Sequence, residues 1–366
     1  MSDRLRIFLT PECGPGQKGD TVSQVLPEFP DLGQLRRQAK ELLRAARAGD
    51  PTALGELTAI SSRIDLNSAQ LTLARRYGLG SWLRLRLEVE RKNMIHRGDS
   101  EGLRRMIRRY PTLTLEPVSS CFGNDSVLGY LGVARFHGLT DHDRAGEIAR
   151  LLLDAGAGAD GPTDTVEAPV VTAASYGEVD MARALIDAGA DLEARAAPDA
   201  GGVPGGTALT HAIAFGNTDV VDLLAAAGAV VHDIVEAAGV GDIDSYPLSE
   251  IPIFSRARAA RAAAVCERLE VLEMLLGSGV PVDADPDNGH PDGSSTLLHE
   301  AAYWGKPRSV EYLIAHGADP NRLDSEHHST PLGWCRHRLA EISAFGEHLT
   351  TPHRVVERIL GSVTTR

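Results

Sequence analysis

Apolar positions along the chain fall into short amphipathic stretches that are separated by glycine. The pattern is clearest in three segments, 172–191, 211–229 and 299–321. Each begins with a short apolar-rich stretch and a glycine, and continues with apolar residues at i, i+3 and i+4 before a Gly-Ala pair. This period is that of an amphipathic α-helix, so each segment predicts two short helices joined at the first glycine.

The glycines recur at a fixed distance, which indicates an internal repeat. In each segment they lie twelve residues apart, at Gly177 and Gly189, Gly216 and Gly228, and Gly305 and Gly317. Glycine ends a helix readily because it adopts a positive φ without steric cost. One pair of short helices cannot bury its apolar stripe alone, so several pairs must stack side by side. The spacing therefore predicts an all-α solenoid of stacked helix-turn-helix units.

The ends of these units resemble the ankyrin repeat. Thr330-Pro331-Leu332 and Thr296-Leu297-Leu298-His299 are similar to its opening motif, Thr-Pro-Leu-His. Its closing motif is matched by Gly189-Ala190-Asp191-Leu192 and by Gly317-Ala318-Asp319-Pro320-Asn321. The resemblance implies an ankyrin-repeat solenoid of about seven to nine units. It also implies that His299 is structural and bonds to backbone between repeats.

Weaker copies extend the array in both directions. They lie at 43–57, 93–111, 134–160, 235–244 and 262–283, and in the last of these Glu267 replaces the first glycine. Residues 69–90 do not match the repeat; they predict a helix, a glycine turn and a second helix, with Trp82 at the join. This part resembles a leader that is common in bacterial ankyrin-repeat proteins, and we expect it to cap the first repeat.

The chain therefore divides into four predicted parts. Residues 1–33 are a tail or a loosely attached segment, and residues 34–92 are a helical N-terminal cap that includes a degenerate repeat. Residues 93–345 are the ankyrin-like array, with an insertion at 246–256 where Pro247 and Pro252 forbid a continuous helix. Residues 346–366 form a C-terminal closing helix.

Aromatic residues gather at one position of the repeat. In an ankyrin array the first helices line the concave face, and residues one, two and five places before the first glycine share one side of that helix. These places hold Phe136, His137, Tyr176, Phe215, Tyr303 and Trp304, and Trp334 and His337 continue the face in the last unit. Exposed aromatic residues are typical anchors for a partner, so the pattern predicts a binding groove. The alternative is that they pack against neighbouring helices and loops.

A column of polar residues supports a second hypothesis. His211, Glu236 and Glu300 lie five residues before their glycines. A half-buried glutamate beside aromatic rings has a raised pKa and can act as a general acid. The alternative function is therefore an isomerase, cyclase or lyase of a bacterial biosynthetic pathway, with residues 246–256 closing over the groove. The same three side chains could instead satisfy nearby loops, and the chain contains no GxSxG, P-loop or dinucleotide motif.

Charge and cysteine content narrow the choice of partner. Residues 111–366 hold 17 Lys/Arg and 37 Asp/Glu, a net charge of −20, which argues against nucleic acid. The four cysteines are far apart and show no metal-binding spacing, so we expect a reducing compartment and neither metal nor cofactor. No apolar run is long enough to cross a bilayer or to act as a signal segment. We therefore expect a cytoplasmic protein that binds a protein or peptide in its groove, with a small-molecule ligand as the alternative and no membrane partner.

Overall fold

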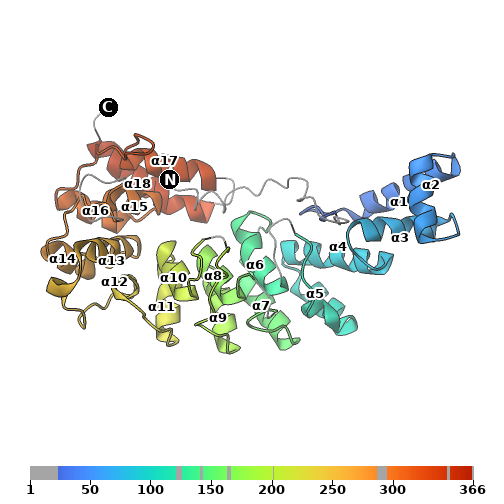
Figure 1. Ribbon diagram of the computed structural model, residues 1–366, viewed down its shortest axis with the longest axis horizontal. Coiled ribbons are helices and arrows are strands. Elements are labelled where there is room, and N and C mark those ends of the chain that lie inside the picture. Colours follow the sequence, from blue (N-terminus) through green and yellow to red (C-terminus); the bar gives the residue numbers. More distant parts are fainter. Residues whose placement is uncertain are drawn as a thin grey trace.

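The computed structural model describes residues 24–120, 126–140, 143–162, 166–200, 202–286, 295–343 and 347–364. Within these ranges every regular element is a helix and there is no strand. The chain runs from a helical leader at one end, through a curved double row of helices, to a C-terminal group of helices at the other end (Figure 1). This is the all-α arrangement that the repeat pattern predicts.

The double row consists of an inner and an outer layer, as the α6, α8, α10 and α7, α9, α11 stacks show in Figure 1. The inner row contains α6 (Val127–Phe136), α8 (Pro169–Tyr176), α10 (Ala208–Ala214), α12 (Ile234–Val240), α13 (Ile253–Val265), α15 (Leu297–Tyr303) and α17 (Pro331–Ile342). The outer row contains α5 (Ser100–Arg109), α7 (Ala145–Asp154), α9 (Val179–Asp187), α11 (Thr218–Ala226), α14 (Leu269–Gly277), α16 (Pro307–Ala315) and α18 (Glu347–Val363). A continuous core of mostly Ala, Val and Leu side chains lies between the rows.

A left-handed residue ends the first helix of each unit. The positions aligned from the sequence all have positive φ in the structure: Gly49, Gly98, Gly138, Gly177, Gly216, Gly241, Glu267 and Gly305. Glu267 adopts φ 54° without being glycine, and its carboxylate accepts a hydrogen bond from the Arg308 backbone N–H at 2.9 Å. A left-handed conformation is costly for residues other than glycine, so this bond helps to hold the turn. The positive φ of Glu267 confirms its assignment to the first-glycine position.

The leader is joined to the array through one long helix. The leader comprises α1 (Leu32–Arg47), α2 (Pro51–Ile60), α3 (Leu66–Arg76) and α4 (Trp82–Arg97), and α4 is the helix that joins it to the array. The sequence placed the boundary between cap and array at residues 92 and 93, but α4 runs without interruption through that point. Its first turns pack with the leader and its last turn serves as the first helix of the next unit, so the two parts share a helix.

The described part of the segment 1–33 is held more firmly than the sequence predicts. Leu26 is only 1% exposed, and the Lys92 ammonium lies 2.8 Å from the Glu28 carboxylate and 3.2 Å from the Pro27 carbonyl oxygen. Tyr130 OH on α6 donates to the same carboxylate at 3.0 Å. Residues 24–31 thus bridge α4 and α6, while residues 1–23 lie outside the described residues.

The insertion expected at 246–256 divides into two parts. Residues 246–252 include the 3₁₀ turn η3 (Leu248–Glu250), and Pro252 stands immediately before α13. Ile253 to Arg256 then form the first turn of this helix, because proline is tolerated just ahead of a helix but not inside one. The extended α13 packs closely along α12, so two first helices follow each other in the inner row.

Side chains from one unit bind the helix ends of another. Asn217, at the start of α11, donates from Nδ2 to the carbonyl oxygens of Ala174 at 2.7 Å and Ser175 at 3.0 Å, both at the end of α8. Similar bonds run from Arg144 to Gly98, Arg268 to Gly239, Lys306 to Gly216 and His353 to Tyr303. The last carbonyl groups of a helix have no partner within it, so these donors satisfy them and fix the spacing of the row.

None of the helices in the described ranges is both long enough and apolar enough to cross a lipid bilayer.

Replacing Asn217 by alanine tests these cross-unit bonds. We expect Asn217→Ala to lower the free energy of unfolding by about 1–2 kcal/mol, because two buried carbonyl groups lose their donor. Urea denaturation followed by circular dichroism measures this change. The control is Arg183→Ala on the exposed face of α9, which should change stability by less than about 0.5 kcal/mol. Equal effects of the two substitutions would contradict the capping role.

Candidate functional site

The aromatic residues predicted to line the groove stand at the C-terminal ends of the inner-row helices. Phe136 and Tyr176 are the last residues of α6 and α8, and Phe215 and Trp304 directly follow α10 and α15. Each precedes the left-handed residue by one or two positions, so the turn that ends the helix also sets the direction of the ring. In the units whose first helices end at Gly138, Gly177, Gly216 and Gly305, the repeat therefore delivers aromatic side chains to the same edge of the row.

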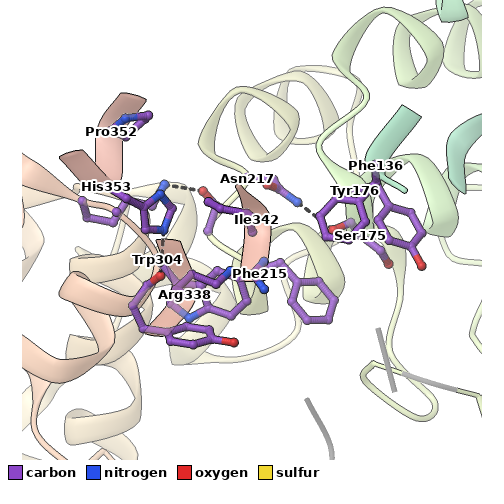
Figure 2. A pocket seen from close by; sticks show the side chains of 14 residues that line it. Phe136, Ser175, Tyr176, Phe215, Asn217, Trp304, Arg338, Ile342, Pro352 and His353 are labelled. Carbon is purple, nitrogen blue, oxygen red and sulfur yellow. Dashed lines mark hydrogen bonds between the residues drawn. The ribbon is translucent and has the colours of Figure 1, made fainter. Parts of the chain in front are cut away.

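These rings form two groups that face a shared cavity. Phe136 and Tyr176 have ring centroids 4.8 Å apart, and Phe215 and Trp304 are separated by 5.7 Å. Between them lies a cavity of about 220 Å³. Figure 2 shows Phe136 and Tyr176 at one side of it and Trp304 with His353 at the other, with Phe215 between them. Tyr176 and Trp304 are 128 positions apart in the chain, and both line this cavity.

Five of the eight predicted ligand-binding residues line this cavity: Phe136, Tyr176, Phe215, Tyr303 and Trp304. Tyr303 also lines a neighbouring cavity of about 410 Å³, together with Trp334 and His337. The eighth residue, His137, packs its ring against Phe136 at 5.3 Å and Tyr176 at 6.0 Å. Burial lowers the pKa of His137 to about 4, so its ring is neutral at pH 7 and behaves as part of the aromatic group.

Several residues of the cavity wall were not found from the sequence. They are Asn217, Lys306, Arg338, Ile342, Pro352 and His353, whereas Ser175 stands two places before Gly177 and so on the predicted groove face. Asn217 and Lys306 directly follow the first glycines of their units, so the same alignment could have found them one position further on. Pro352 and His353 come from α18, whose rotation about its own axis is set by packing on α17, α16 and α15.

The wall is polar where the helix ends meet it. Lys306 Nζ donates to the Gly216 carbonyl oxygen at 2.5 Å, and burial lowers the pKa of this ammonium. Arg338 lies with its guanidinium carbon 5.2 Å from the centre of the Tyr303 ring and 5.5 Å from that of Trp304. Burial raises the pKa of Tyr303 to about 12, so its hydroxyl is uncharged at pH 7. The cavity thus combines aromatic walls with two cations.

The three candidate catalytic residues are each bound to protein groups, and His211 lies behind the cavity wall, with its ring 6.0 Å from that of Phe215. His211 is fully buried, its Nε2–H donates to the Val203 carbonyl oxygen at 2.9 Å, and its Nδ1 lies 2.8 Å from Ser175 Oγ. Glu236 accepts hydrogen bonds from Thr210 Oγ1 at 2.7 Å and from the backbone N–H of His232 at 2.7 Å.

Glu300 completes this set, and it pairs with Arg261 Nε at 2.8 Å. None of the three candidates lines either of the two cavities, and no residue of 246–256 does so. These contacts favour the structural interpretation that the sequence left open, in which the polar groups hold loops and neighbouring helices. The general acid/base hypothesis stays a prediction that no contact seen here supports.

His299 makes the contacts that the resemblance implies. Its Nδ1 lies 2.9 Å from Thr296 Oγ1, and its Nε2–H donates to the Ser329 carbonyl oxygen of the next unit at 3.1 Å. The ring is buried, and this burial lowers its pKa. His299 therefore links the opening of one repeat to the opening of the next.

Comparison with known proteins supports the repeat assignment. A family model for three ankyrin repeats matches residues 140–234, and a model for a single ankyrin repeat matches residues 295–325. The chain therefore contains ankyrin repeats, and its described part forms an ankyrin-repeat solenoid. No curated protein matches this chain significantly.

Solved structures with a similar arrangement include two ankyrin repeat domains. The domain of human ASB11 is 17% identical, with a TM-score of 0.35, and the match covers 76% of this chain and 98% of that one. The domain of Bcl-3, described as a unique member of the IkappaB protein family, is 21% identical, with a TM-score of 0.33 and coverage of 75% and 97%.

The protonation of His211 gives a direct test of its buried role. Burial lowers its pKa to about 4, so we expect its ring NMR signals to keep their neutral positions from pH 7.5 down to pH 5. A neutral buried ring stabilises the fold above pH 6.5, and this contribution is lost as the pH falls from 6.5 towards 4. A His211→Gln variant assigns the signal. A titration midpoint near 6.5 would show that the ring is accessible to water, as a catalytic base must be.

Proposed function

We propose that this protein is a recognition module that binds a protein or peptide partner along its concave groove. Ankyrin repeats are protein-interaction modules, and this chain contains them at 140–234 and 295–325. The observation that carries the proposal is the row of aromatic side chains around one cavity, contributed by four separate inner-row helices. Side chains of this kind, clustered in a pocket at the centre of a surface, dominate binding energy in protein interfaces.

The size of the cavity supports a side chain as its occupant. At about 220 Å³ it lies below the ~300–1,000 Å³ that is usual for small-molecule pockets. It adjoins the second cavity of about 410 Å³ through Tyr303, so an extended chain can place successive side chains in both. Two cavities joined at one residue suit a peptide with two bulky side chains, although the second cavity alone falls within the small-molecule range.

Two further features belong to the same proposal. Cys266 and Cys335 are buried free thiols, which suits a reducing compartment such as the cytoplasm. Residues 24–31, which precede the leader helices, lie beside α6 at one end of the groove. The resemblance of the leader to that of bacterial ankyrin-repeat proteins implies a bacterial origin. Neither nucleic acid nor a membrane is proposed as a partner, because the array itself is strongly acidic.

Selection from a displayed library of random peptides tests the proposal. We expect selected peptides to bind the intact chain, and Phe215→Ala to weaken them at least tenfold, because the ring forms the middle of the cavity wall. Affinity is measured by fluorescence anisotropy with a labelled selected peptide. The control is Phe254→Ala at the start of α13, an aromatic residue that is 48% exposed and lies away from the cavity.

Circular dichroism spectra of both variants check that each one remains folded. If Phe215→Ala and Phe254→Ala have equal effects, or if neither changes the affinity, the groove is not the binding surface.

A further inference from the structure

The cavity wall has the opposite charge to the body that surrounds it. Its described lining residues include Lys306 and Arg338, and none of them is Asp or Glu. The stretch 111–366 carries 37 acidic against 17 basic residues, so a wall with two cations and no carboxylate departs from its surroundings. A cationic spot inside an acidic surface selects against positively charged ligands at the spot and against polyanions around it.

Lys306 has unused capacity to bind an anion. Its ammonium donates to the Gly216 carbonyl oxygen, and the carboxylates of Glu267 and Asp219 act on it through space without forming an ion pair with it among the described residues. An ammonium carries three donors, so two of them are not used by this bond. A buried charge is costly unless it is paired, which makes an anionic ligand favourable at this place.

Arg338 presents the second cation in a fixed orientation. Its guanidinium lies against the rings of Tyr303 and Trp304, and the residue is only 9% exposed. The nearest carboxylate is that of Glu341, 3.4 Å from Nη1, and it also lies 3.0 Å from His337 Nε2 and 3.3 Å from Tyr303 OH. Glu341 is therefore shared among three groups and leaves part of the guanidinium fork for another acceptor.

Building on the proposed function, we propose that the cavity binds a carboxylate carried next to an aromatic side chain of a peptide partner. The carboxylate pairs with Lys306 and Arg338, and the aromatic side chain packs between Tyr176, Phe215 and Trp304. A planar guanidinium recognises a carboxylate through two parallel hydrogen bonds, which gives direction as well as attraction. The class of partner is thus a peptide that carries one carboxylate beside an aromatic anchor and is not strongly acidic as a whole.

Two small probes separate charge from shape. N-acetyl-phenylalanine carries the aromatic ring and a carboxylate, whereas N-acetyl-phenylalaninamide keeps the ring and replaces the carboxylate by a neutral amide. The chain has only three tryptophans, so its indole N–H signals form a simple NMR spectrum, and Trp→Phe variants assign them. We expect the Trp304 signal to move during titration, Trp82 in the leader to stay unchanged, and the acid to bind about tenfold more tightly than the amide.

Charge-removing variants locate the effect. Arg338→Gln should abolish the preference for the acid, and Arg338→Lys should restore part of it. The matched control is Arg336→Gln on the same helix, where the side chain is 61% exposed and pairs with Glu357 outside the cavity. Lys306→Gln and its exposed neighbour Arg308→Gln form a second pair, with circular dichroism as the check on folding.

Equal binding of acid and amide, or no movement of Trp304 with either probe, overturns this inference. The proposed function is judged separately, since peptides selected from the library can depend on Phe215 without carrying any acidic residue. Selected peptides that lack acidic residues but bind through Phe215 would leave the recognition module in place and remove its preference for carboxylates.

Discussion

Hydrogen bonds that cross from one helix pair to another are the interaction on which the rest of this molecule depends. Each first helix is short, seven or eight residues in α8, α10, α12 and α15, so it has little stability of its own. Its last carbonyl groups point out of the helix and need donors. Asn217, Lys306, Arg268 and His353 supply them from other units, and apolar packing between the rows does the remainder. Stacking therefore satisfies both the core and the backbone at once.

The same bonds explain why the candidate site is found at the helix ends. The residue that stops each first helix lies next to the carbonyls that need a donor, and the aromatic residue stands just before it. Donor, carbonyl and ring consequently meet at one edge of the row. Lys306 shows the result most clearly, because it both caps the turn after α10 and forms part of the cavity wall. The polar part of this cavity wall is built from groups that also hold the array together.

The leader uses a different device to join the array. Glu88 and Arg91 on α4 are almost fully buried, and Arg91 donates to the carbonyl oxygens of Leu113, Glu116 and Pro117. Burial lowers the pKa of Arg91, and the neighbouring Glu88 carboxylate acts on that pKa in the opposite direction. Breaking such a buried pair is costly because one charge is left without compensation. The polar junction thus fixes where the leader ends and the groove begins.

The sequence by itself determined the period, the helix pairs, the left-handed positions and the identity of the aromatic row. These depend on local rules: a glycine ends a helix, and residues at i, i+3 and i+4 share a side. Glu267 could be placed among the glycines because the twelve-residue spacing to Gly279 was kept. The same rules identified Phe136, Tyr176, Phe215, Tyr303 and Trp304, all of which line one cavity.

Only the tertiary structure decided which of these residues face each other and which polar groups remain available. His211 and Glu236 occupy the same position of their repeats, five residues before the glycine. In the structure His211 is bound to the Val203 carbonyl oxygen and Glu236 to the Thr210 hydroxyl. Arg338, Pro352 and His353 enter the cavity from α17 and α18, whose orientation follows from packing on α15 and not from any local signal. The physical reason is that periodicity fixes a residue's place on its own helix, whereas its partners depend on contacts between segments far apart in the chain.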